Sequence, residues 1–248
     1  MLFQFIAKNF TMTDDTLTFV FWSLAVLCFV IPYLLGSLNF GVIISRILYH
    51  DDIRKYGSGN AGATNMLRTY GKGAGIATMV LDMLKCLVAV LIGWLLLPTL
   101  ASEPIPDSAT VAIAFEPRYL AGFGCVVGHI FPCFYNFKGG KGVSSVAMLM
   151  FCASPVIGLI ELVCFVVIVA GTKFVSLASV MCAALYPIFL NALSFGFPFG
   201  AKGFPILISL MISALVIFMH RENIKRIYNG TESKISFSKK SKEDKENK

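Results

Sequence analysis

The stretch TLTFVFWSLAVLCFVIPYLLGSLNFGVIIS, from Thr16 to Ser45, contains no charged residue in 30 positions. A helix needs about 20 predominantly apolar residues to cross the hydrocarbon core of a bilayer, so this stretch is long enough to span a membrane. It is also longer than the apolar region of a secretory signal peptide, and no A-x-A cleavage site closes it. We therefore expect a first membrane helix that is retained.

The composition of the whole chain agrees with this expectation. Of 248 residues, 56% are hydrophobic and 14% are charged, whereas roughly a quarter of the residues in soluble domains are charged. The net charge of +7 does not indicate a nucleic-acid partner. Nine of the 21 Lys and Arg residues follow His220 and most others lie between apolar stretches, as is typical of charges that orient a membrane protein. The seven cysteines include no C-x-x-C pair, so neither a metal site nor a disulfide framework is predicted.

The chain contains further apolar segments that predict membrane helices. Together with the first, they cover residues 17–35, 73–97, 119–134, 143–153, 155–170, 174–193 and 204–220. The fourth segment is short, because eleven residues rise only about 16 Å as a helix, and it could be the first half of one helix over residues 143–170. Pro155 favours a break, because proline removes a helix donor and clashes with the preceding turn.

The charges between these segments predict an orientation. Segments 50–72 and 137–142, and the residues directly after His220, are basic and should be cytoplasmic, whereas segment 98–118 is acidic and should lie outside. An even number of crossings must then follow residue 142, which requires the break before Pro155. We expect an all-α polytopic membrane helix bundle of about seven transmembrane helices, with the N-terminus outside and the C-terminus cytoplasmic.

The chain is expected to form a single domain. Residues 1–228 should make up the transmembrane part. Residues 229–248 are polar, lysine-rich and poor in hydrophobic side chains, so we expect a basic, disordered cytoplasmic tail.

Three polar, glycine-rich segments interrupt the apolar pattern, and the first runs from Gly36 to Arg46. It is either a helix end whose arginine reaches the membrane interface, or a polar notch in which Ser37 and Arg46 face a substrate.

The second segment begins GSGNAGATN at Gly57. Glycine permits backbone conformations that turn several N–H groups toward one anion, and a helix beginning near Thr64 would point its N-terminus at a phosphate. The alternative is a flexible loop. The predicted phosphate-binding residues here are Gly57, Ser58, Gly59, Asn60, Gly62, Thr64, Asn65, Arg68 and Lys72.

The third segment, GHIFPCFYNFKGGKG from Gly128, offers a second cationic site. Its lysines could equally be orienting charges, and its histidine a core residue. Neither segment fits G-x-x-x-x-G-K-[ST], so no ATP-binding P-loop is predicted. Two basic sites favour a ligand with several negative charges. The candidate residues of this segment are His129, Lys138, Gly139, Gly140, Lys141 and Gly142.

A few ionisable residues stand out elsewhere. His220 and Asn223 are three residues apart and share a helix face, and histidine is the usual general base near neutral pH. Asp82 and Lys85 lie within one apolar segment and either pair with each other or contact a substrate. Glu161 is alone in its segment, and the sequence suggests no partner for it.

Four motifs together resemble the PlsY-type bacterial acyl-phosphate:glycerol-3-phosphate acyltransferases. They are Gly36-Ser37 through Arg46, GSGNAGATNMLRTYGKGAG from Gly57, GHIFPCFYNFKGGKGV from Gly128 and HRENIKRIYNGTE from His220. Asn39 stands where proline is common in the family, and Ser144-Ser145 where Ala-Thr is usual.

The resemblance implies a reaction in which an acyl group passes from acyl-phosphate to the 1-hydroxyl of glycerol 3-phosphate. The products are lysophosphatidic acid and phosphate, the first acylation of phospholipid synthesis. The family fold is a seven-helix bundle of the bacterial inner membrane with its active site at the cytoplasmic face. No cofactor is expected. The implied partners are glycerol 3-phosphate, acyl-phosphate, membrane lipids and the enzyme that supplies acyl-phosphate.

The resemblance also implies catalytic roles for Ser37, Arg46, His220 and Asn223. With Lys141, the polar residues would anchor phosphate and position the acceptor. His220 would orient or deprotonate the hydroxyl, unless a substrate phosphate accepts that proton.

Two other functions, an acyl-CoA-dependent acyltransferase and a transporter, are less well supported by the sequence. Acyl-CoA-dependent enzymes use H-x-x-x-x-D, and the residues five after the three histidines are Lys55, Phe134 and Lys225. A transporter of a phosphate-bearing anion would also contain charged residues within membrane helices, but we find no convincing similarity between the halves of the chain.

Overall fold

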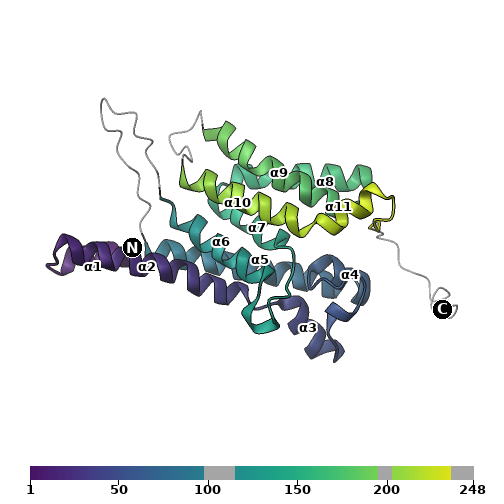
Figure 1. Ribbon diagram of the computed structural model, residues 1–248, viewed down its shortest axis with the longest axis horizontal. Coiled ribbons are helices and arrows are strands. Elements are labelled where there is room, and N and C mark those ends of the chain that lie inside the picture. Colours follow the sequence, from purple (N-terminus) through teal and green to yellow (C-terminus); the bar gives the residue numbers. More distant parts are fainter. Residues whose placement is uncertain (98–114, 195–202, 236–248) are drawn as a thin grey trace.

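The computed structural model describes residues 1–97, 115–194 and 203–235, and it is built from helices (Figure 1). The first range contains α1 (Leu2–Asn9), α2 (Asp14–Gly36), α3 (Phe40–Tyr49), the single turn η1 (Ile53–Lys55), α4 (Ala63–Tyr70) and α5 (Lys72–Leu96). The second contains α6 (Pro117–Ile130), the turn η2 (Cys133–Tyr135), α7 (Val143–Ala153), α8 (Pro155–Thr172) and α9 (Val175–Ser194). The third contains α10 (Phe204–Met219) and α11 (Arg221–Tyr228). The predicted all-α architecture is confirmed.

Several helices have the length and composition of membrane spans. Among the described residues, four stretches qualify, and α10 with α11 makes a fifth if these two helices, bent by 54°, form one broken span. The four are Asp14–Tyr49, Lys72–Leu96, Pro155–Thr172 and Val175–Leu193. α7 is apolar but shorter. The count of seven spans and their orientation stay predictions.

The break predicted before Pro155 is confirmed. α7 ends at Ala153 and α8 begins at Pro155, with Ser154 between them in an extended conformation. Proline is well suited to the first helical position, because the N–H that it lacks would have no partner there and its fixed φ already suits a helix.

Outward-facing side chains on these helices are apolar, as a lipid-facing surface requires. Val163 and Val167 of α8 are 61% and 63% exposed, and Phe19 of α2 is 73% exposed. In water these side chains would be unfavourable, whereas in the hydrocarbon of a bilayer they need no cover.

α5 is central to the bundle, because it packs against α2, α4, α6 and α7. The helices α2 and α6 approach each other closely through glycine. A Cβ atom added to Gly36 would lie 2.2 Å from the carbonyl oxygen of Cys125, and one added to Gly128 would lie 2.1 Å from that of Tyr33. Only glycine permits this approach, which brings the end of α2 against the end of α6.

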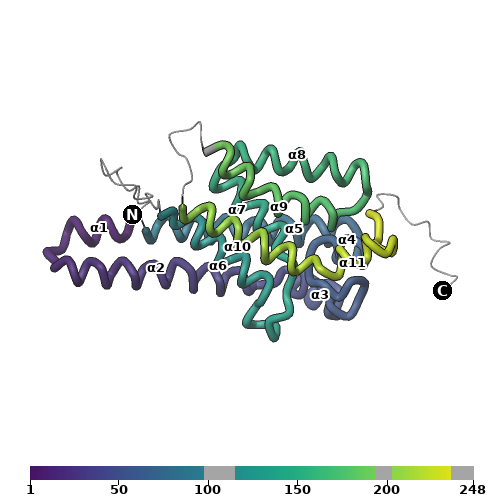
Figure 2. Tube along the Cα trace, turned by 45° about the horizontal axis from the view of Figure 1, so that its top comes forward, coloured from purple at the N-terminus to yellow at the C-terminus, as the bar shows by residue number. Residues whose placement is uncertain are grey.

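The polar segments gather at one end of the bundle. The views in Figures 1 and 2 place α3, α4 and α11 at the end opposite α1. The loop between α6 and α7 joins them there, since Arg54 donates to the carbonyl oxygens of Tyr135 and Lys138. The sequence motifs, far apart along the chain, therefore meet in space.

Residues 229–235, which the sequence places in a disordered tail, instead lie against the bundle. The backbone N–H of Ile235 donates to the carbonyl oxygen of Lys173 at 2.8 Å, and Arg68 donates to that of Ser233 at 2.9 Å. Glu232 is buried among hydrogen-bond donors. The average composition of the tail is lysine-rich, so it gives no indication that one of its carboxylates is buried. Residues 236–248 lie outside the described residues, as does most of the acidic segment 98–118.

Candidate active site

A polar cavity of about 170 Å³ lies where α4, α5, α6, α9 and the α10–α11 junction meet. Ten residues predicted from the sequence line it: Ser58, Asn60, Gly62, Thr64, Asn65, Arg68, His129, Lys141, His220 and Asn223. Five further polar residues that were not assigned to the site also line it: Asp82, Ser144, Ser176, Ser179 and Glu232. The structure thus brings together parts of the second and third glycine-rich segments and the His220 motif.

Asn65 organises the second glycine-rich segment. Its side-chain amide donates to the carbonyl oxygens of Tyr56 and Asn60 at 2.9 Å, and its oxygen accepts from the N–H of Ser58 at 3.1 Å. Gly57 has a φ of +58°, and a Cβ there would lie 2.2 Å from the oxygen of Asn65. The loop is therefore wound tightly around one buried amide.

The first turn of α4 faces the cavity. α4 begins at Ala63, one residue before the predicted start, and within the described part of the chain no side chain caps it. Gly62, Ala63 and Thr64 all line the cavity. The first N–H groups of a helix have no partner within the helix, so this turn can donate to a phosphate.

Lys141 supplies a cation to the cavity. Its ammonium group donates to the side-chain oxygen of Asn223. Burial, reinforced by the positive charge of Arg226, lowers the pKa of Lys141 to about 8. An anion beside the ammonium would compensate its lost hydration, as expected of a phosphate ligand.

Glu232 holds one side of the cavity in place. Its carboxylate accepts hydrogen bonds of 2.7 Å from Ser176, Asn223 and Arg226. Burial acts to raise the pKa of Glu232, but these hydrogen bonds prevail and keep it below its ordinary value. Ser176 and Ser179 are three residues apart and share a face of α9, and both line the cavity, but only Ser176 contacts Glu232.

His220 lines the cavity. Its ring nitrogen Nδ1 lies 2.8 Å from the carbonyl oxygen of Val216. A carbonyl oxygen can only accept, so Nδ1 carries the hydrogen. In the neutral ring Nε2 is then a free acceptor, the form required of a general base.

His129 belongs to a buried cluster with Asp82 and Lys85. The ammonium of Lys85 lies 2.8 Å from Asp82 and 3.1 Å from Nδ1 of His129. Of the two alternatives left open by the sequence, the structure shows the pairing, and Asp82 also lines the cavity. Lys85 also donates to the carbonyl oxygens of Gly36 and Leu38, at 3.0 and 2.7 Å. These carbonyls lie at the end of α2, where helical partners are missing. The cluster therefore fixes the break between α2 and α3.

The third glycine-rich segment lies directly on this cluster. The N–H of Gly140 donates to the carbonyl oxygen of His129, and a Cβ on Gly140 would lie 2.0 Å from Nε2 of the same histidine. Gly142, with a φ of +84°, leads into α7. These glycines shape the loop without lining the cavity.

Ser37 is buried between the two helix ends. It donates to the carbonyl oxygen of Tyr33 at 2.9 Å and accepts from the N–H of Cys133 at 3.3 Å. It is not among the described residues that line the cavity. In this arrangement its hydroxyl joins α2 to the loop around η2.

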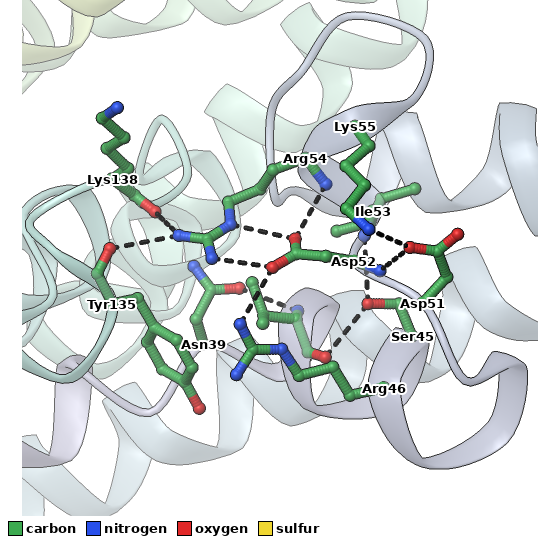
Figure 3. A network of polar contacts seen from close by, with 11 residues as sticks. Asn39, Ser45, Arg46, Asp51, Asp52, Ile53, Arg54, Lys55, Tyr135 and Lys138 are labelled. Atoms are coloured by element: carbon green, nitrogen blue, oxygen red, sulfur yellow. Dashed lines mark hydrogen bonds and ion pairs between the residues drawn. The ribbon is translucent and has the colours of Figure 1, made fainter.

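Arg46 takes part in a second network, whose members do not line the cavity. Figure 3 shows the guanidinium groups of Arg46 and Arg54 converging on Asp52, at 3.0 and 2.7 Å. Hydrogen bonds from Arg54, opposed by burial, hold the pKa of Asp52 well below its usual range. The Arg46 side chain is 55% exposed and lies 5.6 Å from the centre of the Tyr135 ring. The predicted Gly59, Lys72, Lys138 and Gly139 likewise do not line the cavity.

A second, apolar cavity of about 450 Å³ adjoins the polar one. It lies between α5, α7, α8 and α9, and five residues line both cavities: Met79, Val143, Ser144, Phe165 and Ser179. Within the described residues, no group of three His, Cys, Asp or Glu side chains is placed to hold a metal ion.

Comparisons with known proteins identify the family of this chain. Residues 26–230 match the family model for glycerol-3-phosphate acyltransferase. The glycerol-3-phosphate acyltransferase of Finegoldia magna is 36% identical over 207 residues, which cover 83% of this chain and 93% of that protein. The fold is similar to the crystal structure of PlsY (YgiH), an integral membrane glycerol 3-phosphate acyltransferase, in its glycerol 3-phosphate form. That match has a TM-score of 0.71 at 33% identity and covers 86% of this chain and 96% of the other. The crystal structure of the same protein in its lysophosphatidic acid form matches with a TM-score of 0.69 at 32% identity.

Proposed function

The chain belongs to the glycerol-3-phosphate acyltransferase family, which produces lysophosphatidic acid, and from that premise we propose that its acyl donor is acyl-phosphate and that the polar cavity receives the phosphates of both substrates. Neither CoA, acyl carrier protein nor a metal ion enters this reaction. The resemblance of the four sequence motifs to acyl-phosphate-dependent enzymes supports the choice of donor, and the absence of H-x-x-x-x-D around the three histidines agrees with it.

The junction of the two cavities is the observation that carries the proposal. Lysophosphatidic acid combines a phosphate head with a long acyl chain, and a site that forms it needs both environments side by side. Lys141, Arg68 and the first turn of α4 offer donors to phosphate in the polar cavity. The apolar cavity begins at residues shared with the polar one, so a chain can lie there while its carbonyl carbon remains at the polar side.

We assign the chemical step to the groups around His220. The 1-hydroxyl of glycerol 3-phosphate attacks the carbonyl carbon of acyl-phosphate and gives its proton to Nε2 of His220 or to a substrate phosphate oxygen. The bond from the carbonyl carbon to the phosphate oxygen then breaks, and inorganic phosphate leaves. Asn223 and Lys141 orient the substrates, and the cationic side chains stabilise the charge on the leaving phosphate.

Ser37 and Arg46 enter the proposal through the family resemblance. We propose that both contact substrate phosphate, close to the break between α2 and α3. In the structure Ser37 binds the N–H of Cys133 and Arg46 binds Asp52. Experiments on these two residues must therefore separate contact with the substrate from support of the loop.

We further propose seven membrane spans, with the polar end of the bundle at the cytoplasmic face of the bacterial inner membrane. The basic segments and the gathering of the polar motifs at one end support this orientation. We also propose that the domain extends to Ile235 rather than ending at Tyr228, which the hydrogen bonds of Ser233 and Ile235 to the bundle support.

The decisive experiment uses purified protein in lipid nanodiscs with palmitoyl-phosphate as donor. We expect phosphate release that depends on glycerol 3-phosphate, yields lysophosphatidic acid and continues in the presence of a chelator. Transfer from acyl-CoA alone would refute the choice of donor. Uptake of glycerol 3-phosphate into liposomes without acyl transfer would instead support a transporter.

A further inference from the structure

Glu161 is a carboxyl group on the wall of the apolar cavity. It lies on α8, is 4% exposed, and neither of its carboxyl oxygens has a hydrogen-bond partner among the described residues. Buried polar groups in proteins are nearly always paired, and an ionisable residue within a membrane helix is costly unless it has a role. The site described above gives Glu161 no such role.

Glu161 lies partway along the side of α8 that lines the cavity. Phe165, which lines both cavities, follows it by one helical turn, a rise of about 6 Å. In the other direction Gly158 lies against the ring of Phe151, since a Cβ on Gly158 would be 2.7 Å from that ring. Along α8, Glu161 therefore lies between Phe165 at the polar junction and the contact of Gly158 with Phe151.

Its surroundings are mainly apolar. Ser144 and Ser179 line the cavity where it joins the polar one, and Tyr186 of α9 is close enough to interact electrostatically with Glu161. Cys182 of α9 also lines the cavity, and its thiol donates to the backbone oxygen of Glu161 at 3.5 Å. An ionised carboxylate is strongly disfavoured in such a place, so the group is expected to be protonated. A protonated carboxyl both donates and accepts a hydrogen bond. A hydroxyl group is the simplest partner that satisfies both functions.

We propose that Glu161 is a specificity-determining residue that favours acyl chains with a hydroxyl group partway along their length, an inference that rests on the proposed function of the apolar cavity as the acyl-chain site. A saturated chain that fills the cavity leaves the carboxyl group unpaired. A hydroxylated chain restores its hydrogen bond. Sites built to bind a hydroxyl discriminate against the analogue that lacks it, because the polar group of the site then loses its partner.

The test compares acyl-phosphates of equal length that are saturated or carry one hydroxyl at successive carbons. For the wild-type protein, kcat/KM relative to the saturated donor should pass through a maximum at one hydroxyl position. In Glu161→Leu, the kcat/KM of the best hydroxylated donor relative to the saturated donor should fall roughly tenfold, as expected from losing one buried hydrogen bond. Glu161→Gln, which keeps a donor and an acceptor, should retain it within about twofold, a range smaller than the effect of one hydrogen bond.

Controls separate this inference from the proposed function. Val163→Leu, on the lipid-facing side of the same helix, should leave the ratio unchanged, and the KM for glycerol 3-phosphate should be the same in all variants. Turnover of saturated donors without any hydroxyl preference, or a preference that persists in Glu161→Leu, would overturn the inference and leave the function standing. Failure to use any acyl-phosphate would instead overturn the proposed function.

Discussion

The side-chain amide of Asn223 donates to the carboxylate of Glu232 at 2.7 Å, which joins the start of α11 to the segment that follows it. The oxygen of the same amide accepts from Lys141, so both ends of the Asn223 side chain are fixed. Arg226 is held by the other oxygen of the carboxylate. One carboxylate from the predicted tail therefore holds both Asn223, which lines the cavity, and Arg226.

Replacing Glu232 by Ala should weaken the use of glycerol 3-phosphate. Asn223 and Arg226 lose their acceptor, and a buried donor without a partner costs about 1–3 kcal/mol. We expect kcat/KM for glycerol 3-phosphate to fall about tenfold or more, mainly through KM, in a steady-state phosphate-release assay.

The matched control for this variant is Glu222→Ala. Glu222 lies next to Asn223 on α11, but 67% of its side chain is exposed and it does not line the cavity. Its replacement should change kcat/KM by less than about twofold, as is usual for exposed ion pairs. Equal losses of kcat/KM at the two positions would show that the hydrogen bonds of Glu232 to Asn223 and Arg226 do not support the use of glycerol 3-phosphate.

The pKa of Lys141 predicts a loss of activity above neutral pH. Its pKa is lowered to about 8, so the ammonium is present below that pH and is lost as the pH rises through it. Only the charged form attracts phosphate. The profile of kcat/KM, which reports the free enzyme, should therefore fall with an apparent pKa near 8.

Lys141→Arg provides the comparison, because arginine keeps its charge throughout this range. Its kcat/KM will be lower, since a guanidinium differs in shape from an ammonium, but the fall near pH 8 should disappear. If the fall persists in this variant, another group causes it.

Gly140→Ala should destabilise the loop that covers the His129 cluster. The added Cβ would lie 2.0 Å from Nε2 of His129, closer than any real contact, so either the loop or the ring must move. Overpacking of this kind costs typically 1–3 kcal/mol. We expect a lower thermal transition in nanodiscs together with reduced turnover, because the same loop carries Lys141.

Gly73→Ala is the control for this substitution. Gly73 lies in the first turn of α5, where an added Cβ would meet nothing within 4 Å. Alanine is favoured over glycine in a helix by about 1 kcal/mol, so the transition should stay the same or rise. A loss as large as that of Gly140→Ala would contradict the steric explanation.

The sequence was sufficient for the long apolar helices because their signals are local, whereas α1 was not predicted. The uncharged stretch through Cys28 and the proline at position 155 both act on the residues around them, and the structure forms the helices and the break there. Likewise the glycines around Asn65 predicted a phosphate site, and this loop lines the cavity. Patterns of this kind depend on neighbours along the chain.

The contribution of Glu232 could not be predicted in the same way. Its partners include Ser176, which is 56 positions away, and only the fold brings them together. A single acidic residue in a lysine-rich tail has no local pattern that distinguishes it from a solvated one. The same applies to Ser37, whose partner at Cys133 comes from the loop after α6.

Arg46 provides the sharpest test of a role that the family resemblance implies. In the structure it binds Asp52 and lies over the Tyr135 ring, with half of its side chain exposed. If it contacts substrate phosphate, Arg46→Ala should lower kcat/KM by at least tenfold, because hydrogen bonds to charged groups contribute about 1.5–3 kcal/mol. Asp52→Asn removes the ion pair but keeps the guanidinium and should have a much smaller effect.

The double variant completes this comparison as a thermodynamic cycle. If Arg46 acts on the substrate, the Asp52 substitution should add little once Arg46 is gone, and the loss in the double variant should equal that of Arg46→Ala. If Arg46 only supports the loop through Asp52, each single variant and the double variant should show the same loss. That result would assign the phosphate of the substrate to Lys141, Arg68 and the first turn of α4 alone.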